Sequence, residues 1–156
     1  IRETLFNWLS PVIIGADCLD AFGGSGALSF EAISRGAKQV TLVEKCSQPL
    51  KNIQENAMRF SIESLSFQYF CENTLDFLAK TSQTFDIIFL DPPFQSALLA
   101  SSIDLIASRQ LLRPNGYVYI ESNTSISPEN MPLNWSLHRT KKAGNVFYAL
   151  YRFVVV

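Results

Sequence analysis

The segment from residue 85 to 94, FDIIFLDPPF, places an acidic side chain, two prolines and an aromatic ring directly after an apolar, strand-like run. The prolines fix an extended backbone, so the carbonyl groups before them cannot enter a helix and remain available as acceptors. Such a motif could hold a planar amine through hydrogen bonds and ring stacking. Its candidate catalytic residues are Asp91, Pro92, Pro93 and Phe94. On this segment alone, prolines that merely stiffen the end of a strand fit equally well.

A glycine-rich loop, DAFGGSG, occupies residues 20–26 and leads into a helix-like segment. Glycines permit a tight turn and the close approach of a ligand, and the start of a helix offers free N–H donors. Two of these glycines match the dinucleotide motif GxGxxG, but Ser29 occupies its third glycine position. Asp20 would repel a pyrophosphate, whereas it suits the cationic amino-acid portion of S-adenosylmethionine. The candidate cofactor contacts in this loop are Asp20, Phe22, Gly23, Gly24, Ser25 and Gly26.

Two further segments could bind the adenosine part of such a cofactor. Glu44 ends the next apolar strand, where its carboxylate could accept both hydroxyl groups of a ribose, and a solvated Glu44 paired with Lys45 is the alternative. After the third strand, the Asn73 side chain could read the edge of an adenine while Leu75 packs against the base. An N-cap role for Asn73 in the following helix is also open. The candidates in these segments are Glu44, Lys45, Asn73, Thr74 and Leu75.

Alternating strands and helices must position these motifs. The apolar pattern predicts a first helix around residues 5–9 and strands at 17–22, 39–44, 66–71, 85–90 and 117–121. It predicts further helices at 27–34, 49–59, 74–80 and 98–111. Strands joined by helices need right-handed crossovers, so we expect an α/β fold with a mainly parallel sheet covered on both faces.

The last part of the chain breaks this alternation. Residues 135–140 and 146–155 are joined by a segment too short for a helix, so they should pair as an antiparallel hairpin. An α/β sheet that ends in such a hairpin is typical of class I methyltransferases, which are Rossmann-like three-layer sandwiches. A plain dinucleotide-binding fold would instead add another parallel crossover. We therefore expect residues 1–156 to form a single methyltransferase domain.

Composition and charge limit the function further. The 156 residues are 47% hydrophobic and carry a net charge of −1, which does not suit a protein that binds nucleic acid over its whole surface. No apolar run approaches the ~20 residues of a membrane span, so we expect a soluble, cytoplasmic protein. The cluster of Arg139, Lys141 and Lys142 could follow an RNA phosphate backbone, and scattered solvated charges are the alternative.

The residues that commonly bind metals give no sign of a metal site. Cys18, Cys46 and Cys71 form no CxxC pair, and each lies in or beside an apolar run, which favours reduced and packed thiols. The single histidine, His138, has no partner cysteines nearby, so we interpret it as a surface or groove residue. We expect neither a disulfide nor a bound metal.

Together, these segments resemble the RsmD family of bacterial methyltransferases, which modify the 2-amino group of a guanine in small-subunit (16S) ribosomal RNA. The matching stretches are RETLFNWL (2–9), CLDAFGGSGALSFEA (18–32), SRGA (34–37), Glu44 and FDIIFLDPPF (85–94). Gly23 stands where that family more often has alanine. Family members also begin with a basic, glycine-containing segment, so we expect such a segment upstream of residue 1.

The resemblance implies S-adenosylmethionine as the cofactor and a seven-stranded sheet of order 3-2-1-4-5-7-6. It also implies that Asp91 and the Pro92 carbonyl hold the guanine amine while Phe94 stacks on a flipped-out base. The expected partner is small-subunit ribosomal RNA, free or in an assembled particle, and the expected enzyme is a monomer. Two alternatives stay open: an N-methyltransferase that acts on adenine or a glutamine amide, and a noncatalytic nucleotide-binding subunit.

Overall fold

The computed structural model describes residues 1–60, 62, 66–93 and 96–155. Its strands are β1 (Asp17–Asp20), β2 (Gln39–Val43), β3 (Phe67–Phe70), β4 (Phe85–Leu90), β5 (Leu112–Ser122), β6 (Trp135–Ala143) and β7 (Val146–Phe153). Its helices are α1 (Arg2–Leu9), α2 (Ala27–Ser34), α3 (Ser47–Arg59), α4 (Thr74–Lys80) and α5 (Ser96–Ser108), with a short 3-10 helix, η2 (Pro128–Asn130). The strands form a seven-stranded sheet in the order β3-β2-β1-β4-β5-β7-β6. The order implied by the resemblance is therefore confirmed, as is the class I methyltransferase fold.

The pairing of the strands also agrees with the predicted layout. β1 to β5 run parallel to one another, whereas β7 is antiparallel to both β5 and β6, so the terminal hairpin is confirmed. The predicted start of β5 at Tyr117 is wrong, because Leu112 already pairs with Phe85, and the register then shifts before Tyr117 pairs with Ile87. The predicted end of α5 at residue 111 is also wrong, since Gln110 adopts a positive φ of 55° that a helix does not allow.

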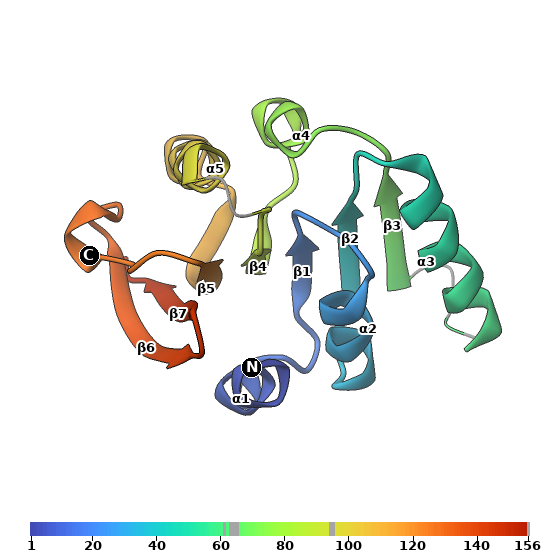
Figure 1. Cartoon of the computed structure of the whole chain (residues 1–156), viewed down its shortest axis with the longest axis horizontal. Helices are drawn as coiled ribbons and strands as arrows, with labels where there is room; N and C mark the ends of the chain where they lie inside the picture. The colour runs from blue at the N-terminus through green and yellow to red at the C-terminus, as the bar shows by residue number, and fades with distance from the viewer. Residues whose placement is uncertain (61, 63–65, 94–95, 156) are drawn as a thin grey trace.

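Two apolar layers enclose the sheet, with α4 and α5 on one side and α1 and α2 on the other (Figure 1). These helices supply Phe77, Leu78, Ile103 and Ile106 to one layer and Leu5, Phe6, Leu9 and Ala32 to the other. Strand β4 is buried on both faces, because Ile87, Ile88 and Phe89 each have 0% of their surface exposed. Such packing gives the carboxyl end of β4 a fixed position.

The cysteines differ partly from the prediction. All three are free thiols, and Cys18 is buried, as expected for a packed residue. Cys46 and Cys71 are exposed, so the prediction of packed thiols is wrong for these two. Both follow the carboxyl ends of strands, where the chain has already left the core.

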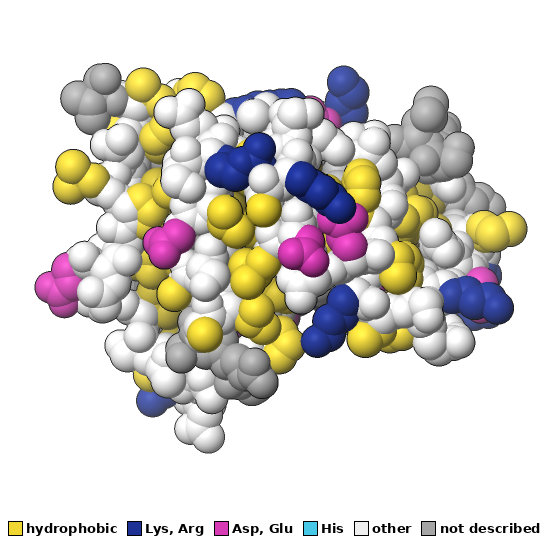
Figure 2. Space-filling view, turned by 90° about the horizontal axis from the view of Figure 1, so that it is seen from above, with side chains coloured by type: hydrophobic (Ala, Val, Ile, Leu, Met, Phe, Trp, Pro, Cys, Tyr) yellow, Lys and Arg dark blue, Asp and Glu magenta, His cyan; other side chains and the backbone are white. Residues whose placement is uncertain are grey.

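The charges of the surface are mixed. Figure 2 shows one face of the molecule, on which acidic and basic side chains are interspersed and hydrophobic side chains lie exposed between them. Neither sign gathers into one large patch on this face, in agreement with the net charge of −1. None of the described helices combines the length and the apolar character needed to cross a bilayer.

Candidate active site

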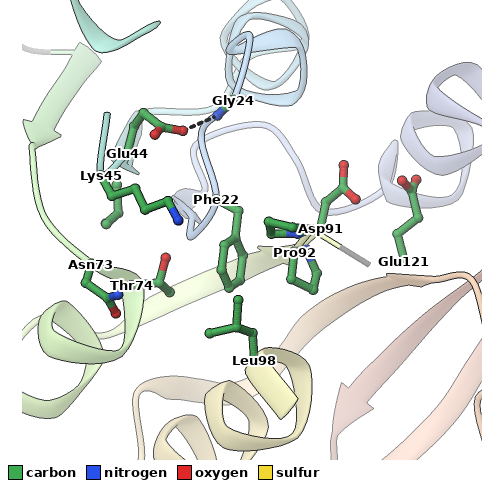
Figure 3. A pocket seen from close by; sticks show the side chains of 12 residues that line it. Phe22, Gly24, Glu44, Lys45, Asn73, Thr74, Asp91, Pro92, Leu98 and Glu121 are labelled. Carbon is green, nitrogen blue, oxygen red and sulfur yellow. Dashed lines mark hydrogen bonds between the residues drawn. The ribbon is translucent and has the colours of Figure 1, made fainter. Parts of the chain in front are cut away.

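A cavity of about 380 Å³ lies at the carboxyl ends of the parallel strands. Its walls are formed by Phe22, Gly24, Val43, Glu44, Lys45, Asn73, Thr74, Asp91, Pro92, Pro93, Leu98 and Glu121. Figure 3 shows Glu44 and Lys45 toward one end, Asp91 and Glu121 toward the other, and the Phe22 ring between them. Ligands of open α/β sheets bind at this edge, so the cavity has the expected place for an active site.

Glu44 is held in position by two backbone donors. Its Oε1 atom accepts a hydrogen bond from the Gly24 N–H at 2.9 Å, and its Oε2 atom accepts one from the Cys46 N–H at 2.8 Å. Each carboxylate oxygen can accept more than one hydrogen bond, so both can still receive the hydroxyl groups of a ribose. Within the described part of the chain, no ion pair joins Glu44 to Lys45, which leaves the predicted alternative without support.

The glycine loop comes very close to the end of β2. A Cβ atom at Gly23 would lie 2.6 Å from Leu42 Cδ2 and 3.3 Å from Glu44 Cβ, so a larger residue would require the end of the Leu42 side chain to shift. Gly24 has a φ of +56°, which glycine adopts without strain. This close approach brings the Gly24 N–H to the Glu44 carboxylate, and the loop and the carboxylate together form a cradle that fits a sugar with two adjacent hydroxyl groups.

Asp20 lies beneath this loop rather than on the cavity wall. Only 2% of its surface is exposed, and its Oδ2 atom accepts a hydrogen bond from Ser29 Oγ at 2.6 Å. It also accepts from the backbone N–H of Phe22, while burial raises its pKa to about 7. Asp20 therefore ties the loop to α2, and its predicted contact with the amino-acid portion of the cofactor stays a prediction.

Asn73 caps α4 and also lies on the cavity wall, where its other predicted role is to read the edge of an adenine. Its Oδ1 atom accepts a hydrogen bond from the Leu75 N–H at 2.9 Å, so the N-cap role in α4 is confirmed. The residue also lines the cavity, with its amide N–H₂ group still able to donate. The Thr74 hydroxyl donates to the Ala21 carbonyl, which ties the start of α4 to the end of β1. Leu75 is not part of the wall, so its predicted packing on a base has no geometric support.

Asp91 meets a second carboxylate at the far end of the cavity. Leu90 of β4 pairs with Ile120 of β5, so the next residues along the two strands, Asp91 and Glu121, end side by side. Burial, followed by the hydrogen bond and the charge of Glu121, raises the pKa of Asp91 to about 8. Asp91 therefore retains a proton near neutral pH in the empty cavity and loses it only in mild base.

The remaining parts of the DPPF motif lie on the same wall. Pro92 is buried and Pro93 is exposed, and both line the cavity beside Asp91. Phe94 lies outside the described residues, so its predicted stacking on a base stays a prediction. Leu98 of α5 contributes an apolar contact below the Phe22 ring (Figure 3).

The cavity brings most of the predicted site residues together. Those on its wall are Phe22, Gly24, Glu44, Lys45, Asn73, Thr74, Asp91, Pro92 and Pro93. Those off the wall are Asp20, Gly23, Ser25, Gly26 and Leu75. Sequence reasoning missed Val43, Leu98 and Glu121. Glu121 could have been found, since an acidic residue that ends the strand beside DPPF must lie at the same edge of the sheet.

The predicted RNA-binding cluster lies on β6, at the edge of the sheet. Lys141 pairs with Tyr148, which pairs with Glu121, so the Lys141 backbone lies two strand spacings, or about 10 Å, from that of Glu121. The Lys142 ammonium lies 5.0 Å from the centre of the Phe147 ring, and Arg139 donates to the His138 carbonyl. No ion pair involves these cations within the described residues.

The described residues contain no group of histidine, cysteine and acidic side chains that could hold a metal ion. His138 instead packs edge-on against Tyr117, with ring centres 5.3 Å apart. Partial burial lowers its pKa, and the charge of Arg139 acts in the same direction. The site therefore contains carboxylates, an amide and backbone groups, which suit adenosine and amine ligands.

Comparisons with known proteins give similarities over almost the whole chain. Residues 1–152 match a family described as conserved hypothetical protein 95. The chain is 41% identical over 152 residues to the Escherichia coli K12 protein named ribosomal RNA small subunit methyltransferase D, covering 97% of this chain and 76% of that protein. The solved structure of Escherichia coli yhhF matches with a TM-score of 0.90 and 40% identity, over 98% of this chain and 84% of that chain. The structure of SMU.776, described as complexed with SAH, shares the fold at a TM-score of 0.77 and 14% identity, over 97% of this chain and 49% of that one.

Proposed function

Because the chain belongs to the RsmD family of small-subunit ribosomal RNA methyltransferases, we propose that it methylates the 2-amino group of a guanine in that RNA. It is an enzyme that uses S-adenosylmethionine to methylate ribosomal RNA. The observation that carries the finer proposal is that a single cavity joins the ribose cradle at Glu44 to the paired carboxyl groups of Asp91 and Glu121. A cofactor at one end and a planar amine at the other would meet within it.

The first end of the cavity would hold the cofactor. Glu44 would accept the two ribose hydroxyl groups, Asn73 would offer its amide N–H₂ group to the adenine edge, and Phe22 would pack beside the cofactor. The backbone at Gly24 would lie against it, because glycine has no side chain that would separate the two. When bound, S-adenosylmethionine supplies an electrophilic methyl group on its sulfonium sulfur.

The second end would hold the guanine amine. Its nitrogen is a poor nucleophile, since its lone pair is delocalised into the ring. Asp91 and the Pro92 carbonyl would accept hydrogen bonds from the two N–H groups and thereby reduce the delocalisation of the lone pair into the ring, so that it can be directed at the methyl group. Holding the two reacting groups in alignment can lower the activation barrier of such a reaction by about 7 to 11 kcal/mol. The overall reaction also releases one proton from the amine, which Asp91 in its ionised form would be placed to receive.

The RNA itself would be gripped at the edge of the sheet. Arg139, Lys141 and Lys142 lie on β6 without acidic partners among the described residues, so their charges are free to contact phosphates. A base that is flipped out of its stack requires contacts on both sides of the target nucleotide. In this proposal a single chain acts in the cytoplasm on either free ribosomal RNA or an assembled particle, and residues 1–156 form one catalytic domain.

A transfer assay tests the proposal. The chain would be incubated with methyl-labelled S-adenosylmethionine and small-subunit ribosomal RNA that lacks its modifications, supplied either free or as assembled subunits. We expect label in the RNA of at least one preparation, and we expect Asp91→Ala to abolish most of the incorporation. The exposed Asp104→Ala on α5 is the matched control and should transfer normally, because Asp104 is not part of the cavity wall. Equal incorporation by wild type and Asp91→Ala would contradict the proposed acceptor site.

A further inference from the structure

Among the described residues of the cavity wall, Glu121 is the acidic one that the proposed cofactor and amine contacts leave without a role. It lies at the carboxyl end of β5, beside Asp91, and Figure 3 shows the two carboxyl groups pointing the same way at one end of the cavity. A second carboxyl group at this place is costly, because two neighbouring carboxyl groups cannot both ionise without repelling each other. A carboxyl group that lies there despite this cost is a candidate for a contact with the substrate.

The side chain of Tyr119 fixes the orientation of Glu121. Its hydroxyl group donates to Glu121 Oε1 at 2.6 Å. The Tyr119 ring is 0% exposed and packs edge-on against the rings of Phe89 and Tyr148, with ring centres 6.4 and 6.5 Å away. A donor held this rigidly keeps the carboxylate in one rotamer and stabilises its charge. The carboxylate also shares a hydrogen bond with Asp91, and its oxygen atoms have lone pairs enough to accept a further hydrogen bond. The carboxylate is therefore prepared for a donor from a ligand.

We propose that the Glu121 carboxylate accepts the N1–H of the target guanine while Asp91 holds the adjacent 2-amino group, so that Glu121 selects guanine. This inference rests on the proposed guanine-N2 function. Guanine presents these two donors side by side on one edge, which matches two adjacent carboxyl groups on neighbouring strands. Adenine and 2-aminopurine instead present an unprotonated N1, whose lone pair would face the carboxylate and be repelled. The pair would thus read the base as well as hold the amine.

Substitution of the base and of Glu121 tests this contact. The nucleotide that wild type methylates would first be mapped, and RNAs with guanine, 2-aminopurine or inosine at that position would be made by ligation. 2-Aminopurine keeps the 2-amino group but lacks the N1–H. Inosine has no 2-amino group, so any label in the inosine RNA measures methylation at other nucleotides. We expect wild type to prefer guanine over 2-aminopurine by about 10- to 100-fold in kcat/KM.

Glu121→Gln should then shift this preference toward 2-aminopurine by about tenfold or more. Tyr119 would donate to the amide oxygen of the new side chain and turn its N–H₂ group toward the base, where it matches the unprotonated N1 of 2-aminopurine. The loss of the O6 atom in 2-aminopurine affects both enzymes equally, so the change in the ratio isolates position 121. If Glu121 acted only through the pKa of Asp91, kcat/KM for the guanine RNA and for the 2-aminopurine RNA would change by the same factor, and the ratio of the two would stay constant.

Controls separate this inference from the proposed function. Glu129→Gln on η2, outside the cavity wall, should keep the wild-type ratio, and calorimetry with S-adenosylhomocysteine should show that Glu121→Gln still folds and binds. If wild type labels the guanine RNA but methylates 2-aminopurine equally well, or if Glu121→Gln keeps the wild-type ratio, the role of Glu121 is wrong and the proposed function stands. If wild type labels no guanine-containing RNA, the proposed function itself fails.

Discussion

Replacement of Glu44 by alanine should weaken cofactor binding by a definite amount. The substitution removes the acceptor for the ribose and also frees the N–H groups of Gly24 and Cys46. Both hydrogen bonds lie at the exposed rim, so water can satisfy the freed donors and the fold should lose little stability. The substitution then mainly reduces the binding free energy of the cofactor, because a ribose hydrogen bond to a charged group contributes about 1.5 to 3 kcal/mol. This corresponds to a Kd about 10- to 150-fold higher.

Calorimetric titration with S-adenosylhomocysteine measures this loss without turnover, because the product carries the same ribose. Glu55→Ala is the matched control, since Glu55 is an exposed glutamate on α3 that takes no part in the cavity wall. We expect the control to bind like wild type and both variants to unfold at similar temperatures. A Glu44→Ala variant with unchanged affinity would refute the ribose assignment, and with it the orientation of the cofactor in the cavity.

Three further predictions concern the acceptor end and the RNA. Asp91→Ala should lower the single-turnover rate by about 10²- to 10³-fold while the cofactor Kd stays within about threefold, and near-normal turnover would leave the Pro92 carbonyl as the working acceptor. Because the pKa of Asp91 is raised to about 8, its carboxyl is protonated below that pH and ionised above it, so kcat/KM should rise with pH through this region. A flat profile between pH 6 and 9 would contradict the need for an ionised Asp91. The double variant Lys141→Ala and Lys142→Ala should lower RNA affinity and reduce the log-log salt slope by about one unit per lost contact, with cofactor affinity unchanged. An unaltered slope would show that these side chains are ordinary solvated charges.

The fold could be predicted from the sequence because the strong patterns are local. The run at 85–90, apolar except for Asp86, favours a strand covered on both faces, and the short segment at 141–145 leaves no room for a helix between its neighbours, which therefore pair. The place of Glu44 follows in the same way, since the last residue after a parallel strand must lie at the carboxyl edge. These inferences need only the order of elements along the chain.

The contacts that were missed depend on packing between distant segments. Asp20 is adjacent to the loop in sequence, yet it is buried and hydrogen-bonded to Ser29 of α2, so its side chain does not line the cavity. The pairing of Asp91 with Glu121 depends on the register of β4 against β5, which an irregular pairing near Phe85 shifts. The exposure of Cys46 likewise depends on where the chain leaves the core, which apolar neighbours in sequence do not show.

Identification of the methylated nucleoside tests the central claim most directly. Small-subunit ribosomal RNA that lacks its modifications would be treated with the chain and S-adenosylmethionine, digested to nucleosides and analysed by mass spectrometry beside synthetic standards. The account predicts N2-methylguanosine, at one position, in the wild-type reaction and its near absence with Asp91→Ala. Methylation at N6 of adenosine, or at a ring nitrogen of guanine, would contradict the assignment of the 2-amino group as the acceptor.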